Sequence, residues 1–138
     1  FKIDEEFKRS RRFHQPLSLL LLDVGVDLDS SFADADARQA FLAEIASVFL
    51  NQCRDIDVIS RFTVSTFMIL LPGTGSAGAD VVAGRMMAEL EAKGLYEGLQ
   101  GRPHSGLATM PATGIPDRSA FLARAEARLQ MSRTSAVS

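Results

Sequence analysis

Apolar side chains recur at the spacing of an α-helix in four segments of the chain. The clearest stripe places an apolar residue every three or four positions: Leu42, Ile45, Ala46, Phe49, Leu50 and Cys53. The same spacing over residues 3–13 predicts a short amphipathic helix, which Pro16 ends. Two further helices are predicted over residues 76–93, with Ser76 as the N-cap, and over residues 119–131, followed by a frayed tail.

Between these helices, runs of apolar residues predict four β-strands. The continuous run at residues 17–22 is typical of a central strand buried on both faces. Strands at residues 56–62 and 66–71 are so close together that an antiparallel hairpin is the natural connection, and a fourth strand covers residues 104–110. This order predicts an α+β domain in which helices cover one mixed sheet. The remaining segments are predicted loops: residues 24–36, 94–103 and 111–117.

Length and composition indicate one globular domain over residues 1–138, with its core over about residues 17–131. The chain is 46% hydrophobic and 23% charged, with a net charge of -2, so neither disorder nor DNA binding is expected. Its longest apolar runs are far shorter than the roughly 20 residues of a membrane span. Because the chain lacks an initiator Met, we expect a piece of a longer, multidomain protein that is cytoplasmic in this segment, even if the parent is anchored in a membrane.

Common metal and nucleotide motifs are absent or incomplete. Cys53 has no second cysteine to pair with, and His14 and His104 do not complete a zinc site of familiar spacing. Residues 73–78 match GxGxxG, but no Lys follows to reach a terminal phosphate, so we interpret them as a turn before a helix. An acidic loop beginning at Asp27 lacks the glycine and the final glutamate of a calcium loop. No metal site is therefore expected.

Several blocks of the sequence, in order, resemble a GGDEF domain, the family of diguanylate cyclases. They are QPLSLLLLD ending at Asp23, CRDIDVISRF followed by TVSTFMILLPGT, HSGLATMP, and AEARLQMSR. The resemblance covers nearly the whole chain. It implies an α+β fold of the nucleotidyl-cyclase type, with a ferredoxin-like core and a mostly antiparallel sheet flanked by helices.

The chain departs from this family where the family does its chemistry. Residues 63–67 read Thr-Val-Ser-Thr-Phe in place of the signature glycines and acids. In a working cyclase, the glycines let the backbone approach GTP, and a signature carboxylate joins the strand-end Asp in holding two magnesium ions. Here Asp23 remains alone, and Arg133 could replace a phosphate-binding Lys. Other family positions also differ: Gly25 replaces an acid, Leu28 a Lys, Ser31 an Asn, Gln39 an Asp, and Val137 a cation. The resemblance therefore implies neither cyclase activity nor bound magnesium.

A second family site, which binds the product cyclic di-GMP, keeps its residues. Its RxxD motif lies five residues before the signature, and Arg54 and Asp57 stand at that spacing. Counting along the following helix brings Arg85 to the place of the third family residue. An arginine can grip guanine O6 and N7 with two hydrogen bonds, while a carboxylate accepts from guanine N–H groups. Alternatively, Arg54 and Asp57 form an ordinary surface ion pair, worth about 0 to 1 kcal/mol.

The sequence thus predicts a catalytically inactive GGDEF domain that acts as a receptor for the bacterial second messenger cyclic di-GMP. Occupancy would be passed to attached sensory or output domains or to a partner protein, and a stacked pair of ligands could join two copies through Arg85. The alternative is a ligand-free scaffold, dimerisation or protein-interaction module. Magnesium-dependent GTP binding would instead indicate residual cyclase chemistry.

Overall fold

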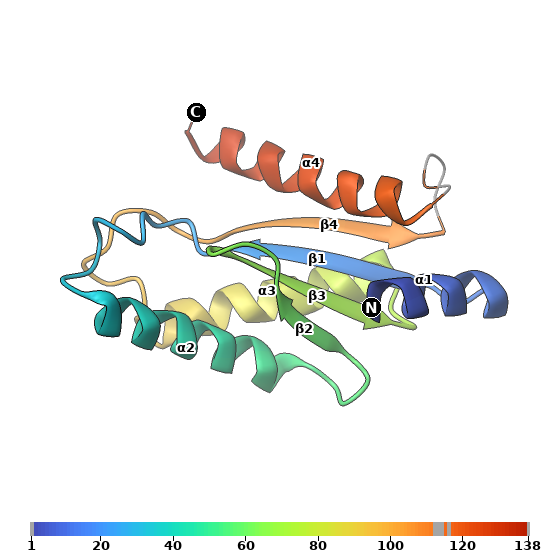
Figure 1. The fold of residues 1–138 in the computed structure, drawn as a ribbon, viewed down its shortest axis with the longest axis horizontal. Coiled ribbons are helices and arrows are strands. Elements are labelled where there is room, and N and C mark those ends of the chain that lie inside the picture. Colours follow the sequence, from blue (N-terminus) through green and yellow to red (C-terminus); the bar gives the residue numbers. More distant parts are fainter. Residues whose placement is uncertain (1, 112–114, 116, 138) are drawn as a thin grey trace.

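The computed structural model describes residues 2–111, 115 and 117–137 of the chain. Helices and strands follow one another in the predicted order (Figure 1): α1 Lys2–Phe13, β1 Leu17–Asp23, α2 Ala35–Gln52, β2 Val58–Arg61, β3 Thr66–Pro72, α3 Ser76–Ala92, β4 His104–Met110 and α4 Arg118–Val137. The loop predicted over residues 111–117 lies partly outside the described residues.

The four strands form a single antiparallel sheet in the order β2-β3-β1-β4. The predicted hairpin is confirmed, because β2 and β3 pair from Val58 with Leu70 to Arg61 with Phe67. The prediction of a mixed sheet is wrong, and the mostly antiparallel sheet that the family resemblance implied is confirmed. The reason is topological: β1 and β2 run in the same direction, but β3 lies between them and is antiparallel to both.

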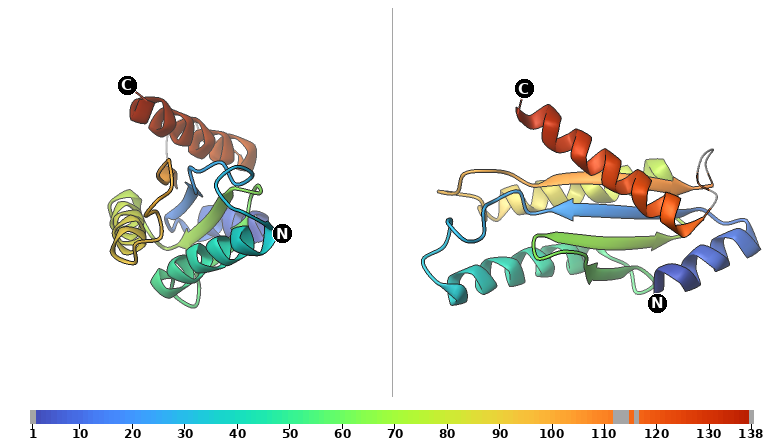
Figure 2. Two further views of the ribbon diagram at one scale, coloured as in Figure 1. Left: turned by 90° about the vertical axis from the view of Figure 1, so that its left-hand side faces the viewer. Right: turned by 45° about the horizontal axis from the view of Figure 1, so that its top comes forward.

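Helices cover both faces of the sheet, and β1 is buried throughout its length. Successive strand side chains point to opposite faces, so Leu20 and Leu22 pack in the cluster shared with α2 and α3. Leu19 and Leu21 pack on the other face with residues of α1 and α4. Figures 1 and 2 show α4 on one side of the sheet and α2 and α3 on the other. This two-sided burial explains why β1 is a continuous apolar run.

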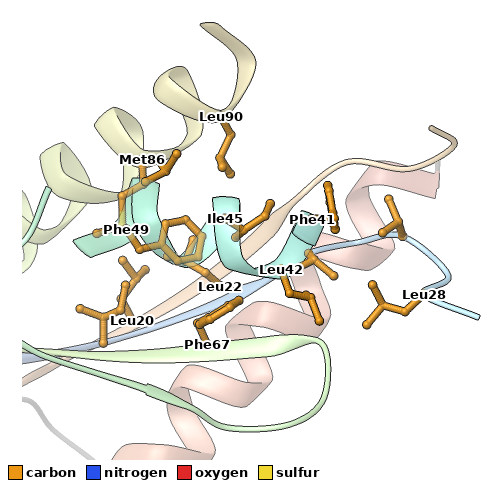
Figure 3. Packing of buried hydrophobic residues seen from close by; sticks show 14 of the residues in the cluster. Leu20, Leu22, Leu28, Phe41, Leu42, Ile45, Phe49, Phe67, Met86 and Leu90 are labelled. Carbon is orange, nitrogen blue, oxygen red and sulfur yellow. The ribbon is translucent and has the colours of Figure 1, made fainter. Parts of the chain in front are cut away.

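The larger core cluster lies between the sheet and the α2–α3 layer (Figure 3). The predicted stripe of α2 supplies Leu42, Ile45 and Phe49, all buried. Phe49 meets Phe67 of β3 edge to face, with ring centroids 5.3 Å apart, which is a favourable geometry for two aromatic rings. These contacts fix α2, and therefore the loop that follows it, against the sheet.

On the opposite face, α4 lies directly on the backbone of β4 at Gly106. A Cβ atom added to Gly106 would lie 2.3 Å from the carbonyl oxygen of Ala125 and 2.3 Å from the amide nitrogen of Leu129. No side chain fits between the helix and the strand here. A glycine is therefore required at this position by close approach of two backbones.

Several predicted element boundaries need correction. Strand β2 spans Val58–Arg61 rather than residues 56–62, because Ile56 and Asp57 belong to the turn that precedes it. Gly75, and not Ser76, is the N-cap of α3, and it makes no side-chain capping bond. Helix α2 begins at Ala35, inside the segment predicted to be irregular, because the Asp34 side chain accepts a hydrogen bond of 2.8 Å from the Ala37 amide. The tail after Met131 is helical to Val137 rather than frayed. Among the helices of the described residues, none is both long and apolar enough to cross a membrane.

Candidate functional site

The Arg54–Asp57 motif forms a tight turn between the end of α2 and the start of β2. Cys53 caps α2, and the Asp57 amide donates a hydrogen bond of 3.0 Å back to the Arg54 carbonyl. Asp57 Oδ2 in turn accepts a 2.8 Å hydrogen bond from the Arg54 amide. The turn is thus closed by two hydrogen bonds between its first and last residues, one from the backbone and one from the Asp57 side chain. The three-residue spacing of Arg54 and Asp57 is the spacing that this turn requires.

The guanidinium of Arg54 is held by three partners. Asp57 Oδ1 lies 2.7 Å from Nη2 and 3.2 Å from Nε, so the carboxylate grips one edge of the guanidinium. Nη2 also lies 2.8 Å from the carbonyl oxygen of Pro72 and 2.9 Å from Oγ1 of Thr74. Both residues lie around the turn from β3 to α3. Arg54 therefore bridges two loops that are far apart in sequence.

Burial divides the pair into a hidden carboxylate and an accessible cation. The Asp57 side chain is 2% exposed, whereas that of Arg54 is 51% exposed. The hydrogen bond to Asp57 raises the pKa of Arg54, so the guanidinium stays charged. The expected contact of Asp57 with guanine N–H groups requires Arg54 to move, because the carboxylate oxygens now bind Arg54. In this conformation Asp57 is a positioning residue, and Arg54 is the group that faces solvent.

Arg85 lies on α3, which packs beside α2. It is exposed and stands nine residues after the first residue of α3, which corresponds to about 13 Å along the helix. Among the described residues, Arg85 forms no ion pair with Asp57 or any other carboxylate. The structure thus brings Arg54 and Asp57 together and leaves Arg85 as a separate exposed cation on the neighbouring helix.

Cys53, next to the turn, is half-buried against the main core. Burial, with the nearby Asp57 charge, raises its thiol pKa to about 11 from 9.0, while Arg54 acts in the opposite direction. The folded state thus favours the neutral thiol, and the stability this provides is present below pH 9 and is lost as the pH rises toward about 11.

We expect iodoacetamide at pH 8 to alkylate the folded domain about 100-fold more slowly than the urea-unfolded chain. Equal rates would contradict this account.

At the other end of β1, the Asp23 carboxylate is surrounded by donors. Its Oδ1 accepts hydrogen bonds from Ser65 Oγ at 3.1 Å and Thr66 Oγ1 at 2.9 Å, and lies 3.3 Å from Nη2 of Arg133. Its Oδ2 accepts a hydrogen bond from the Gly25 amide at 3.2 Å. Arg133, assigned from the resemblance to a phosphate-binding position, is instead the ion-pair partner of the strand-end acid.

Neighbouring residues restrict what positions 25 and 28 can contribute to this region. A Cβ atom added to Gly25 would lie 1.7 Å from the Arg102 carbonyl oxygen, so no acidic side chain fits there. Leu28 is 8% exposed and packs in the main core. Burial lowers the pKa of His104, with Arg102 and Arg133 adding to the shift and Asp23 opposing it. Around Asp23, no three His, Cys, Asp or Glu side chains of the described residues gather as metal ligands would.

Other positions taken from the resemblance are distributed around this region. Gln39 is exposed on α2 and Ser31 is half-buried in the preceding loop, while the Val137 side chain lies outside the described part of α4.

Sequence reasoning missed the partners of Arg54 in the β3–α3 turn, Pro72 and Thr74. It had no signal for them, because one of the contacts uses a backbone carbonyl and both depend on how the two loops fold together.

No family model matches the chain, and no curated protein matches it in sequence. Solved structures do match it. The diguanylate cyclase SiaD of Pseudomonas aeruginosa, solved in complex with its activator SiaC, has a TM-score of 0.82 at 24% identity. That match covers 97% of this chain and 52% of the SiaD chain, so this chain spans about half the length of SiaD.

Two shorter structures match over most of their own length. The active GGEEF domain of a diguanylate cyclase from Vibrio cholerae has a TM-score of 0.82 at 20% identity, covering 95% of this chain and 85% of that one. The GGDEF domain of DgcB from Caulobacter crescentus, solved in complex with c-di-GMP, has a TM-score of 0.81 at 16% identity, covering 97% and 81%. The chain therefore has the fold of GGDEF diguanylate cyclase domains.

Proposed function

We propose that this domain binds cyclic di-GMP through Arg54, with Asp57 holding Arg54 and Arg85 assisting, and that it does not make cyclic di-GMP. The single observation that carries the proposal is the contrast between two acids. Asp57 is buried and aims a half-exposed guanidinium at solvent, whereas Asp23 has its own oxygens engaged by Arg133 and two hydroxyls. The Arg54 site presents a half-exposed guanidinium to solvent, whereas the Asp23 carboxylate is paired with Arg133.

The accessible guanidinium suits a guanine-containing ligand. Its fork of donors matches the O6 and N7 acceptors of guanine, and its charge and planarity also suit a phosphate or a stacked base. Arg85 adds a second exposed cation on the helix beside the turn. Two exposed arginines favour an anionic, guanine-bearing dinucleotide over a cationic ligand.

The surroundings of Asp23 support the second half of the proposal, that no cyclase chemistry occurs. A two-magnesium mechanism needs several carboxylate oxygens to face the ions. The described residues offer one carboxylate, which already accepts from two hydroxyls and one amide and pairs with Arg133. Thr63 and Ser65 form a hairpin turn without glycine, so the backbone is not freed for close approach to a nucleotide. These residues do not fit a magnesium pair.

Calorimetric titration with cyclic di-GMP tests the proposal. We expect micromolar or tighter binding by the parent domain, and binding at least about 30-fold weaker in Arg54→Ala, because a charged, two-point hydrogen bond is lost. Arg54→Lys should weaken binding nearly as much, since a lysine keeps the charge but lacks the paired N–H donors of the guanidinium. Arg85→Ala should weaken binding by a smaller factor.

Arg38→Ala is the matched control, because Arg38 is an arginine at the opposite end of α2 with its own partner, Asp29. It should bind as the parent does. If Arg54→Ala binds as tightly as Arg38→Ala, the assignment of the site is wrong. A folded parent that does not bind at all would favour the ligand-free scaffold or interaction module that the sequence left open.

A further inference from the structure

The Arg54 guanidinium connects the turn of the proposed ligand site to the N-terminal helix α1. Arg54 Nη2 binds the carbonyl of Pro72 and the hydroxyl of Thr74. The same short segment is bonded to the chain that leaves α1. The Gly73 amide donates to the Pro16 carbonyl at 2.8 Å, and Ser18 Oγ donates to the Thr74 carbonyl at 2.8 Å. The β3–α3 turn is thus clamped between Arg54 and the segment that follows α1.

The clamp continues into the last turn of α1. Ser10, which is 7% exposed, donates from its hydroxyl to the Gln15 carbonyl and accepts at its own carbonyl from the Gln15 amide. Gln15 directly precedes Pro16, whose ring limits backbone motion. Pro16 is therefore connected to the end of α1 through the two hydrogen bonds between Ser10 and Gln15.

A hollow gives α1 room to respond. A cavity of about 360 Å³ separates the helix from the Arg54–Asp57 turn. One wall carries Arg9 and Ser10 of α1, the other Asp55 and Ile56 of the turn, and Pro72 and Gly73 also line it. On its other side α1 is held by Phe7 against Phe121, with ring centroids 6.0 Å apart. The helix is therefore packed on one face and borders this cavity on the face toward the ligand site.

Ligand binding would compete with this clamp. The Nε and Nη2 edge of Arg54 is taken by Asp57, and Nη2 is shared further with Pro72 and Thr74. A two-point grip on a guanine that uses Nη1 and Nη2 needs an Nη2 hydrogen that now binds the β3–α3 turn. The turn must then give up at least one of its two bonds to Arg54.

We propose that Arg54 is a latch that couples the Arg54–Asp57 turn to α1, so that engaging the guanidinium loosens the end of α1. Only the part played by the ligand rests on the proposed function. The latch itself belongs to this chain, and its removal by mutation has the same consequence. Helix α1 is then the element through which site occupancy reaches neighbouring segments.

Hydrogen–deuterium exchange of the whole chain tests the latch. Without any ligand, Arg54→Ala should make the amides of residues 8–13 exchange about fivefold faster, because two hydrogen bonds to the β3–α3 turn are lost. The β1 amides report global opening and serve to normalise the comparison. Arg85→Ala removes an arginine that does not contact this turn and should leave α1 unchanged. Thr74→Val removes one of the two bonds and should give a smaller increase while keeping cyclic di-GMP binding.

The outcomes separate the latch from the proposed function. If α1 exchanges equally in Arg54→Ala and Arg85→Ala, the latch does not exist, whether or not the ligand binds. If Arg54→Ala loosens α1 but the parent binds no cyclic di-GMP by calorimetry, the latch stands and the proposed ligand is wrong. If cyclic di-GMP binds the parent and leaves α1 exchange unchanged, the ligand does not operate the latch and the proposal is overturned.

Discussion

Placing an acid at position 25 is expected to destabilise the domain rather than create a metal site. Gly25 has φ of +72°, which costs a side-chain-bearing residue about 1 to 2 kcal/mol, and an added Cβ would lie 1.7 Å from the Arg102 carbonyl oxygen. The clash joins a Cβ atom and a backbone carbonyl oxygen, and the position of neither depends on a side-chain rotamer. We expect Gly25→Asp to lower the free energy of unfolding by at least about 4 kcal/mol in urea titrations.

Gly73→Ala separates the two causes. Gly73 has nearly the same φ, +73°, but nothing lies within 4 Å of an added Cβ. Gly73→Ala should therefore lower the free energy of unfolding only by the backbone contribution, about 1 to 2 kcal/mol. Gly25→Ala should lower it further, by the contribution of the clash. If Gly25→Ala and Gly73→Ala are equally stable, Arg102 does not close the position, and the region around Asp23 is more open than we describe.

The second large effect is expected at Gly106, where α4 rests on β4. Gly106→Val would drive side-chain atoms into the backbone of Ala125 and Leu129, each 2.3 Å from an added Cβ. The helix must then lift off the strand and expose Phe121 and Leu129, which are now buried. We expect a loss of at least about 3 kcal/mol, or failure to fold, measured by thermal and urea unfolding.

Gly84→Ala is the matched control for this substitution. Gly84 lies inside α3 with nothing within 4 Å of an added Cβ. Alanine there should stabilise the domain by about 0.5 to 1 kcal/mol, because glycine is a poor helix former. A Gly106→Val variant as stable as the parent would show that α4 does not sit against β4 as the structure has it.

The sequence predicted the sheet and helices well because burial controls both. The apolar run of β1 and the stripe of α2 are direct consequences of two-sided and one-sided burial. The predictions that were wrong concern helix ends, which burial does not determine. Serine is a favoured N-cap residue, yet Gly75, one residue before Ser76, is the N-cap of α3. The apparent frayed tail is helical because α4 continues along the sheet to Arg133, where the ion pair with Asp23 holds it.

The candidate site was only partly accessible to sequence reasoning. The spacing of Arg54 and Asp57 corresponds to one tight turn, so their pairing follows from local geometry. The side-chain partners of Asp23 come from a hairpin and from a helix 110 positions later, and no local pattern joins them. The steric reason for Gly25 depends on a loop that folds back from Arg102. Such long-range contacts become visible only in the folded chain.

Calorimetric titration of the unmodified domain with cyclic di-GMP tests the central claim most directly. The account predicts micromolar or tighter binding that is at least about 30-fold weaker in Arg54→Ala and unchanged in Arg38→Ala. A domain that is folded by circular dichroism and gives no binding heat, or one that binds equally well without Arg54, would contradict it.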